Sequence, residues 1–174
     1  MRLSFLLTVA VLLLAVSTGS ASWLEVEHAD KSDKDTFRLF VGKPIKGRVG
    51  GFYFSCVSNT WSEAYVGLNY TPTSGLEFGI GYGVETAGDH RRIGSYAVYS
   101  KDRLTLRYAY ENGGSGEYYK AGIDYRATPK LTLGVVDHKF FGTGTKLDYR
   151  LSNEVTSRLT IYPEEAFVSM VFAF

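Results

Sequence analysis

The chain has 174 residues, with 19 lysine and arginine residues against 18 aspartate and glutamate residues, and a single cysteine. This balance lacks the basic excess of nucleic-acid-binding proteins, so we expect no nucleic-acid partner, and one cysteine excludes an intramolecular disulfide. Nineteen glycines, thirteen tyrosines and eleven phenylalanines favour strands and turns over helices, so we expect a single all-β domain.

The first 21 residues have the order of a secretory signal peptide. Arg2 precedes an apolar run from Phe5 to Val16, and small residues follow up to Ala21. The apolar run has about a dozen residues, which is short of the roughly 20 that span a bilayer as a helix. We therefore predict a cleaved signal peptide over residues 1–21 and a mature domain over residues 22–174.

Most of the mature chain alternates between apolar and polar residues, which places the two kinds of side chain on opposite faces of a strand. Leu76, Phe78 and Ile80, for example, share one face of their segment, whereas the glutamate and the glycine between them share the other. Turn signals divide the chain into about twelve such strands. They are 22–29, 36–42, 47–57, 61–71, 75–85, 92–100, 103–111, 117–126, 130–138, 143–151, 155–162 and 165–174.

The last strand is apolar at every second position, and the chain ends on an aromatic residue. Phe174 closes the chain, preceded at alternate positions by Phe172 and Met170. This ending resembles the C-terminal assembly signal of bacterial outer-membrane β-barrels, a broad architectural class. The resemblance implies localisation in the outer membrane of Gram-negative bacteria and contact with outer-membrane lipid and lipopolysaccharide. It also implies that the barrel-assembly machinery recognises the C-terminal strand.

A sheet within lipid must close on itself, because lipid cannot satisfy the backbone groups of a free edge. The predicted fold class is therefore all-β, a closed antiparallel up-and-down transmembrane β-barrel of about 12 strands, with 10 or 8 as alternatives. An even count places both termini on the periplasmic side. The periplasmic turns are then 43–46, 72–74, 101–102, 127–129 and 152–154, and the outer loops are 30–35, 58–60, 86–91, 112–116, 140–142 and 163–164.

The polar faces of the strands predict the lining of the lumen. They carry eight acidic and eight basic residues, a balance that favours pairing of carboxylates with basic groups. Glycines on the same faces would leave room for long arginine side chains or relieve crowding. The residues that we expect to line the lumen are Glu63, Glu77, Arg103, Arg107, Lys120, Asp124, Arg126, Lys146, Asp148, Arg150 and Arg158.

The chain offers few candidates for catalysis or metal binding. An acyl-hydrolase site would draw on His28, His90 and His138, on the neighbouring acids Asp89 and Asp137, and on Ser95 or Ser100. Adjacent strand residues face opposite ways and the chain has no G-x-S-x-G motif, so we predict no catalytic residue. Scattered histidines give no metal-ligand spacing, and we expect neither a metal nor a cofactor.

The sequence therefore predicts an outer-membrane barrel that is a narrow passive channel, or a structural barrel with a charge-paired lumen. Two alternatives stay open. One is an outer-membrane lipid-modifying enzyme of the acyl-hydrolase type. The other is a soluble periplasmic β-barrel that binds a ligand inside, and it would require the apolar faces inside and the charged faces outside.

Overall fold

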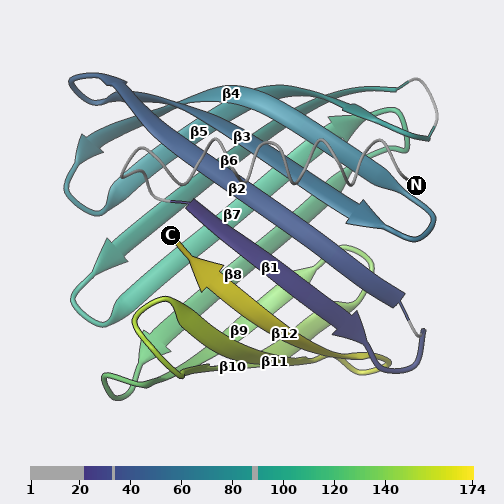
Figure 1. Cartoon of the computed structure of the whole chain (residues 1–174), viewed down its shortest axis with the longest axis vertical. Helices are drawn as coiled ribbons and strands as arrows, with labels where there is room; N and C mark the ends of the chain where they lie inside the picture. Colours follow the sequence, from purple (N-terminus) through teal and green to yellow (C-terminus); the bar gives the residue numbers. More distant parts are fainter. Residues whose placement is uncertain (1–21, 33, 88–89) are drawn as a thin grey trace.

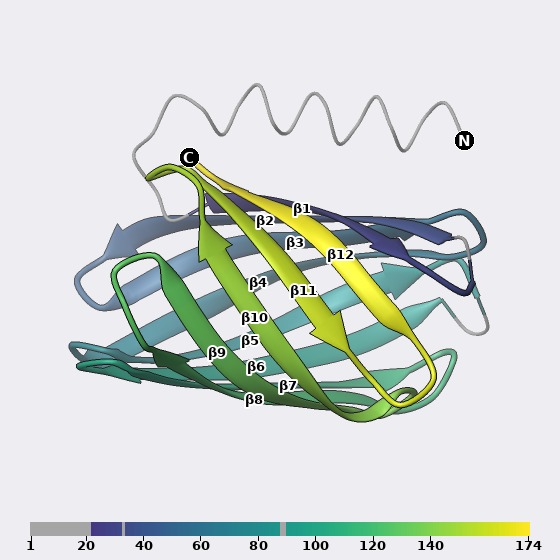
Figure 2. The same ribbon diagram turned by 90° about the horizontal axis from the view of Figure 1, so that it is seen from below.

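The computed structural model describes residues 22–32, 34–87 and 90–174, so the predicted signal peptide lies outside the described residues. Twelve antiparallel strands form one sheet, and the sheet closes into a barrel because β1 pairs with both β2 and β12. Figure 1 shows the tilted strands, and Figure 2 shows opposite walls of the barrel in side view. The described residues include no helix that is long and apolar enough to cross a membrane.

The strands have seven to thirteen residues, close to the roughly 9–11 that cross a bilayer at a tilt. They are β1 (Ser22–Ala29), β2 (Lys34–Lys46), β3 (Val49–Ser58), β4 (Ser62–Thr73), β5 (Leu76–Glu85), β6 (Arg91–Lys101), β7 (Leu104–Gly113), β8 (Tyr118–Arg126), β9 (Leu131–His138), β10 (Gly142–Arg150), β11 (Val155–Ile161) and β12 (Ala166–Ala173). This confirms the predicted up-and-down barrel and its strand number.

Both ends of the described barrel domain meet at one end of the barrel. The backbone N–H of Phe174 donates to the carbonyl of Ser22 over 3.1 Å. We call this the terminal end and the opposite one the distal end. The terminal end carries the turns that follow the even-numbered strands, and the distal end carries the loops that follow the odd-numbered strands.

Two predicted turns begin too early, because β2 and β4 continue through their prolines. The β2–β3 pairing shifts register next to Pro44, and the β4–β5 pairing shifts next to Pro72. Pro72 lies inside its bulge, where a residue is left out of the hydrogen-bond ladder, and Pro44 directly precedes a bulge at Ile45. The reversals follow at Gly47 and Gly75, whose φ angles of 60° and 86° suit glycine.

The outer surface of the barrel is apolar. On β8, Ile123 and Tyr125 are 54% and 48% exposed, whereas Asp124 between them is 4% exposed. The other strands contribute exposed apolar side chains in the same way, among them Ile80 on β5 and Leu133 on β9. On these strands the charged side chains point inward and the aliphatic ones outward, which is the reverse of what a soluble ligand-binding barrel requires.

Aromatic rings fill the interior between β1 and β6. Trp23 stacks on Phe40 with ring centroids 6.0 Å apart, and Phe40 stacks on Phe52 at 5.8 Å. Tyr96 meets Phe40 and Phe52 edge-on at 6.2 and 5.3 Å. Because β2 and β6 are not neighbours in the sheet, the contact between Phe40 and Tyr96 spans the interior. We call these four residues the aromatic stack.

Glycines on β4 and β5, the strands between those that carry Phe52 and Tyr96, make room for the aromatic stack. A Cβ atom at Gly79 would overlap the Tyr96 ring, and one at Gly67 would overlap the Phe52 ring. Of the two predicted reasons for these glycines, space for arginine side chains was wrong at these positions, and relief of crowding stays a prediction. Because Gly67 and Gly79 have no side chain, the flat rings of Phe52 and Tyr96 can lie directly against the backbone.

Substitution of Gly79 by alanine should destabilise the barrel, because overpacking a filled interior costs about 1–3 kcal/mol. Gly122→Ala is the matched control, because a Cβ atom there meets only a carbonyl oxygen at 3.6 Å. The temperature at which the folded, fast-migrating gel band disappears measures the effect. Equal unfolding temperatures for the two variants would contradict the packing described here.

Candidate functional site

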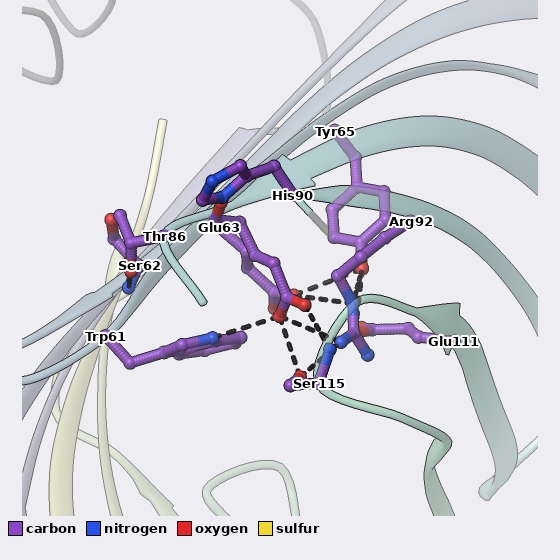
Figure 3. Close-up of polar contacts among 10 residues, drawn as sticks. Trp61, Ser62, Glu63, Tyr65, Thr86, His90, Arg92, Glu111 and Ser115 are labelled. Carbon is purple, nitrogen blue, oxygen red and sulfur yellow. Dashed lines mark hydrogen bonds and ion pairs between the residues drawn. The ribbon is translucent and has the colours of Figure 1, made fainter. Parts of the chain in front are cut away.

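At the distal end, acidic side chains from three other strands surround the Arg92 guanidinium (Figure 3). Its Nη1 donates to Glu85 Oε2 over 2.9 Å and its Nη2 donates to Glu111 Oε2 over 3.3 Å. Its Nε lies 3.5 Å from Glu63 Oε2, and the arginine is 2% exposed. We call these four residues, together with Trp61, Tyr65 and Ser115, the Arg92 cluster.

Tyr65 joins the guanidinium to two of the carboxylates. Its hydroxyl accepts from Arg92 Nε over 2.8 Å and lies 3.1 Å from Glu63 and 2.9 Å from Glu111. The hydroxyl has one proton and can donate to only one of them at a time. Three carboxylates around one cation also leave an acidic excess, so Arg92 is the charge on which the cluster depends.

The loop between β7 and β8 closes over the cluster. Ser115 in this loop donates to Glu85 from its hydroxyl, over 2.8 Å to Oε2, and from its backbone N–H. Trp61 Nε1 donates to the same Oε2 over 3.1 Å. A Cβ atom at Gly114 would overlap the Glu85 carboxylate, so the glycine lets the loop approach this closely. The cluster therefore ties four strands and two loops together, the β3–β4 loop through Trp61 and the β7–β8 loop through Ser115.

A second polar network follows β1, β2, β7, β8, β10 and β11. Arg158 donates from Nε to Asp148 and from Nη1 to Glu25, both over 2.8 Å. Asp124 pairs with Arg107, and its Oδ1 lies 2.5 Å from Lys146 Nζ. Further ion pairs connect the two halves and extend them to β2, through Lys146–Asp148 at 4.0 Å, Arg38–Glu25 at 3.6 Å and Arg38–Glu27 at 2.8 Å. We call these eight residues the Arg158 network.

Nine of the eleven predicted lumen residues fall into three groups, and Glu77 and Lys120 lie outside them. Glu63 belongs to the Arg92 cluster, and Arg107, Asp124, Lys146, Asp148 and Arg158 belong to the Arg158 network. Glu77 accepts from the Tyr96 hydroxyl over 2.6 Å, and Lys120 is in register with Ala109 and His138 on the neighbouring strands. Arg103, Arg126 and Arg150 line a pocket at the terminal end.

The set of predicted lumen residues left out Arg92, the centre of the distal cluster. A signal for it was present, because Arg92 alternates with the outward-facing Ile93. The arginine pair at positions 91 and 92 lies at the predicted border between a loop and a strand, which obscured this alternation. Its three carboxylate partners come from other strands, and no local pattern brings them together.

The terminal-end pocket has a volume of about 560 Å³. Its rim consists of residues from three turns, and its deeper wall includes Arg107, Asp124 and Asp148 of the Arg158 network. The network thus borders the pocket on its inner side. Threonine and serine hydroxyls complete the lining, at Ser74, Ser100, Thr105, Thr132 and Thr156.

The candidate catalytic residues are not assembled into a site within the described residues. His28 lies 3.0 Å from Asp35, His90 lies 2.9 Å from the Glu85 carbonyl, and His138 packs against aromatic rings. Ser95 is exposed on β6 and Ser100 hydrogen-bonds Thr105, whereas Asp89 lies outside the described residues. The described residues contain no group of three or more side chains placed to bind a metal ion.

No family model and no curated protein matches the chain. Solved barrels do match it in shape. The KdgM porin aligns with a TM-score of 0.59 and 15% identity, over 88% of this chain and 99% of that chain. The NanC porin aligns at 0.53 and 14%, over 88% and 99%. Outer membrane phospholipase A from Escherichia coli aligns at 0.55 and 12%, over 90% and 97%. These likenesses show that the chain has the fold of outer-membrane β-barrels.

Substitution of Arg92 by methionine should destabilise the barrel by about 3–5 kcal/mol, because it leaves three clustered carboxylates without their cation. Arg91→Met is the matched control, since the neighbouring arginine is exposed at the start of β6. Urea unfolding of the refolded barrel, followed by tryptophan fluorescence, measures the difference. If Arg92→Met unfolds at the same urea concentration as Arg91→Met, the cluster does not hold the distal end together.

Proposed function

We propose that this protein is a small outer-membrane barrel that conducts poorly, because paired charges and packed rings close its lumen. The apolar outer surface and the porin-like fold support an outer-membrane channel barrel. The observation that carries the finer proposal is the Arg158 network, in which each acid is within ion-pair distance of at least one arginine or lysine.

The Arg158 network and the aromatic stack together draw side chains from eight of the twelve strands into the interior. The Arg158 network draws side chains from β7, β8, β10, β11, β1 and β2. The aromatic stack draws its rings from β1, β2, β3 and β6. Barrels of about eight strands are filled by side chains and those of 16 or more hold water channels, so a twelve-stranded barrel can be either. The Arg158 network and the aromatic stack favour a lumen that is filled by side chains.

Paired charges resist the entry of ions for an energetic reason. An ion that displaces one partner leaves the other charge unpaired in a poorly solvated interior, which costs about 3–5 kcal/mol. Asp124 and Glu25 are each buried and each bound to basic groups from two strands. Separation of these pairs would have to precede conduction along this side of the lumen.

We also propose how the barrel reaches and sits in the membrane. Residues 1–21 act as a cleaved signal peptide, and Met170, Phe172 and Phe174 on the outer face of the last strand form the signal read by the barrel-assembly machinery. The terminal end then faces the periplasm. The apolar exterior contacts outer-membrane lipid, including lipopolysaccharide in the outer leaflet.

The conductance of the purified barrel in planar bilayers tests the closed lumen. The unmodified protein should give almost no ion current. Asp124→Ala should increase the current several-fold or lower the unfolding temperature, because it releases Arg107 and Lys146 from their shared partner. Asp35→Ala is the control, since Asp35 is exposed at the distal end. Large current from the unmodified protein, or no change in either property in Asp124→Ala, would contradict the proposal.

A further inference from the structure

The terminal-end pocket has an excess of positive charge that the barrel itself does not neutralise. Six basic residues line it, Lys101, Arg103, Arg107, Arg126, Lys130 and Arg150. Three acidic residues, Asp102, Asp124 and Asp148, line it too. Two of these acids are already bound to basic partners in the Arg158 network. Asp102 alone is left to offset the basic residues at the rim.

The arginines at the rim keep their donors available. Within the described part of the chain, the side chains of Arg103 and Arg150 form no hydrogen bond and no ion pair. Arg126 donates from Nη2 to the carbonyl of Asp102 over 2.8 Å, which fixes its guanidinium and leaves its other donors free to bind a ligand. Arg103 lies in the β6–β7 turn, and Arg126 and Arg150 are the last residues of β8 and β10. The three line one smaller recess with Thr128 and Pro129.

The pocket lining indicates the chemistry of a ligand. A guanidinium presents a planar fork of donors that matches a carboxylate or a phosphate. The threonines Thr105, Thr132 and Thr156 line the same pocket, and their hydroxyls can bond the hydroxyl groups of a sugar. A volume of about 560 Å³ lies in the range of small-molecule sites.

We propose that this pocket binds a hydroxylated anion, a sugar derivative with two or more carboxylate or phosphate groups, that enters from the terminal end. Arg103, Arg126 and Arg150 bind the anionic groups, and the threonines bind the hydroxyls. The Arg158 network borders the pocket on its inner side, so the ligand is held at the terminal end. The poorly conducting barrel then also acts as an anion receptor.

This inference goes beyond the proposed function, and the two can fail separately. Binding in a detergent micelle does not depend on whether ions cross the barrel. A conducting barrel that still binds the anion would overturn the closed lumen and leave the pocket in place. A barrel that neither conducts ions nor binds the anion would overturn the pocket and leave the closed lumen in place.

Isothermal titration calorimetry of the refolded barrel at low salt tests the pocket. The probes are fructose 1,6-bisphosphate, galactarate and, as a neutral control, sucrose. We expect saturable binding of at least one anion and none of sucrose, and binding should weaken at high salt because screening reduces the attraction between exposed charges. The stronger of the two anionic probes identifies phosphate or carboxylate as the preferred group.

Arg103→Gln and Arg150→Gln are the informative variants, because neither side chain supports another residue in the barrel. Each should weaken binding of the anion about tenfold, the loss expected for one charge-assisted contact. Arg91→Gln at the distal end is the matched control and should bind as tightly as the unmodified protein. Heat-modifiable gel migration establishes that each variant is folded, and Arg126→Lys, which keeps the charge and loses the fork, should bind more weakly.

If neither fructose 1,6-bisphosphate nor galactarate shows saturable binding, the inference is overturned. Equal affinity of Arg103→Gln, Arg150→Gln and the unmodified protein would also overturn it. Binding of sucrose as strong as that of the anions would show that charge does not select the ligand and would overturn it as well.

Discussion

The structure depends on one constraint, which is that a sheet in lipid has no water to solvate charges or free backbone groups. Closure of β1 onto β12 satisfies the backbone, and the two-residue period of each strand then sends every second side chain inward. Charged residues such as Asp124 are therefore placed inside together with their counter-ions. Because the outward face is apolar, the charged side chains lie in the interior, where they form ion pairs with one another.

The charges are balanced over the chain and unevenly distributed along the barrel axis. At the distal end three carboxylates share Arg92. At the terminal end Arg103 and Arg150 form no ion pair among the described residues. The Arg158 network lies between these two groups and pairs its own charges. Although the formal net charge is near zero, the Arg92 cluster at the distal end is acidic and the terminal-end pocket is basic.

The sequence predicts the strands well because alternation is a local property. β1 has its predicted bounds, and the errors at the ends of β2 and β4 come from prolines that lie in or beside bulges instead of in turns. The partners inside the barrel are not local. Arg158 and Glu25 are far apart in the chain, and only closure of the barrel brings them to 2.8 Å. The aromatic rings that the glycines accommodate likewise come from other strands.

The central claim is the direction in which the strand faces point, and spin labels on β8 test it most directly. In a Cys56→Ser background, labels at Ile123→Cys and Gly122→Cys report access to oxygen, which concentrates in lipid, and to a water-soluble nickel chelate. The structure predicts that the label at 123 collides strongly with oxygen and that the label at 122 does not. Strong oxygen access at 122 with weak access at 123 would contradict it.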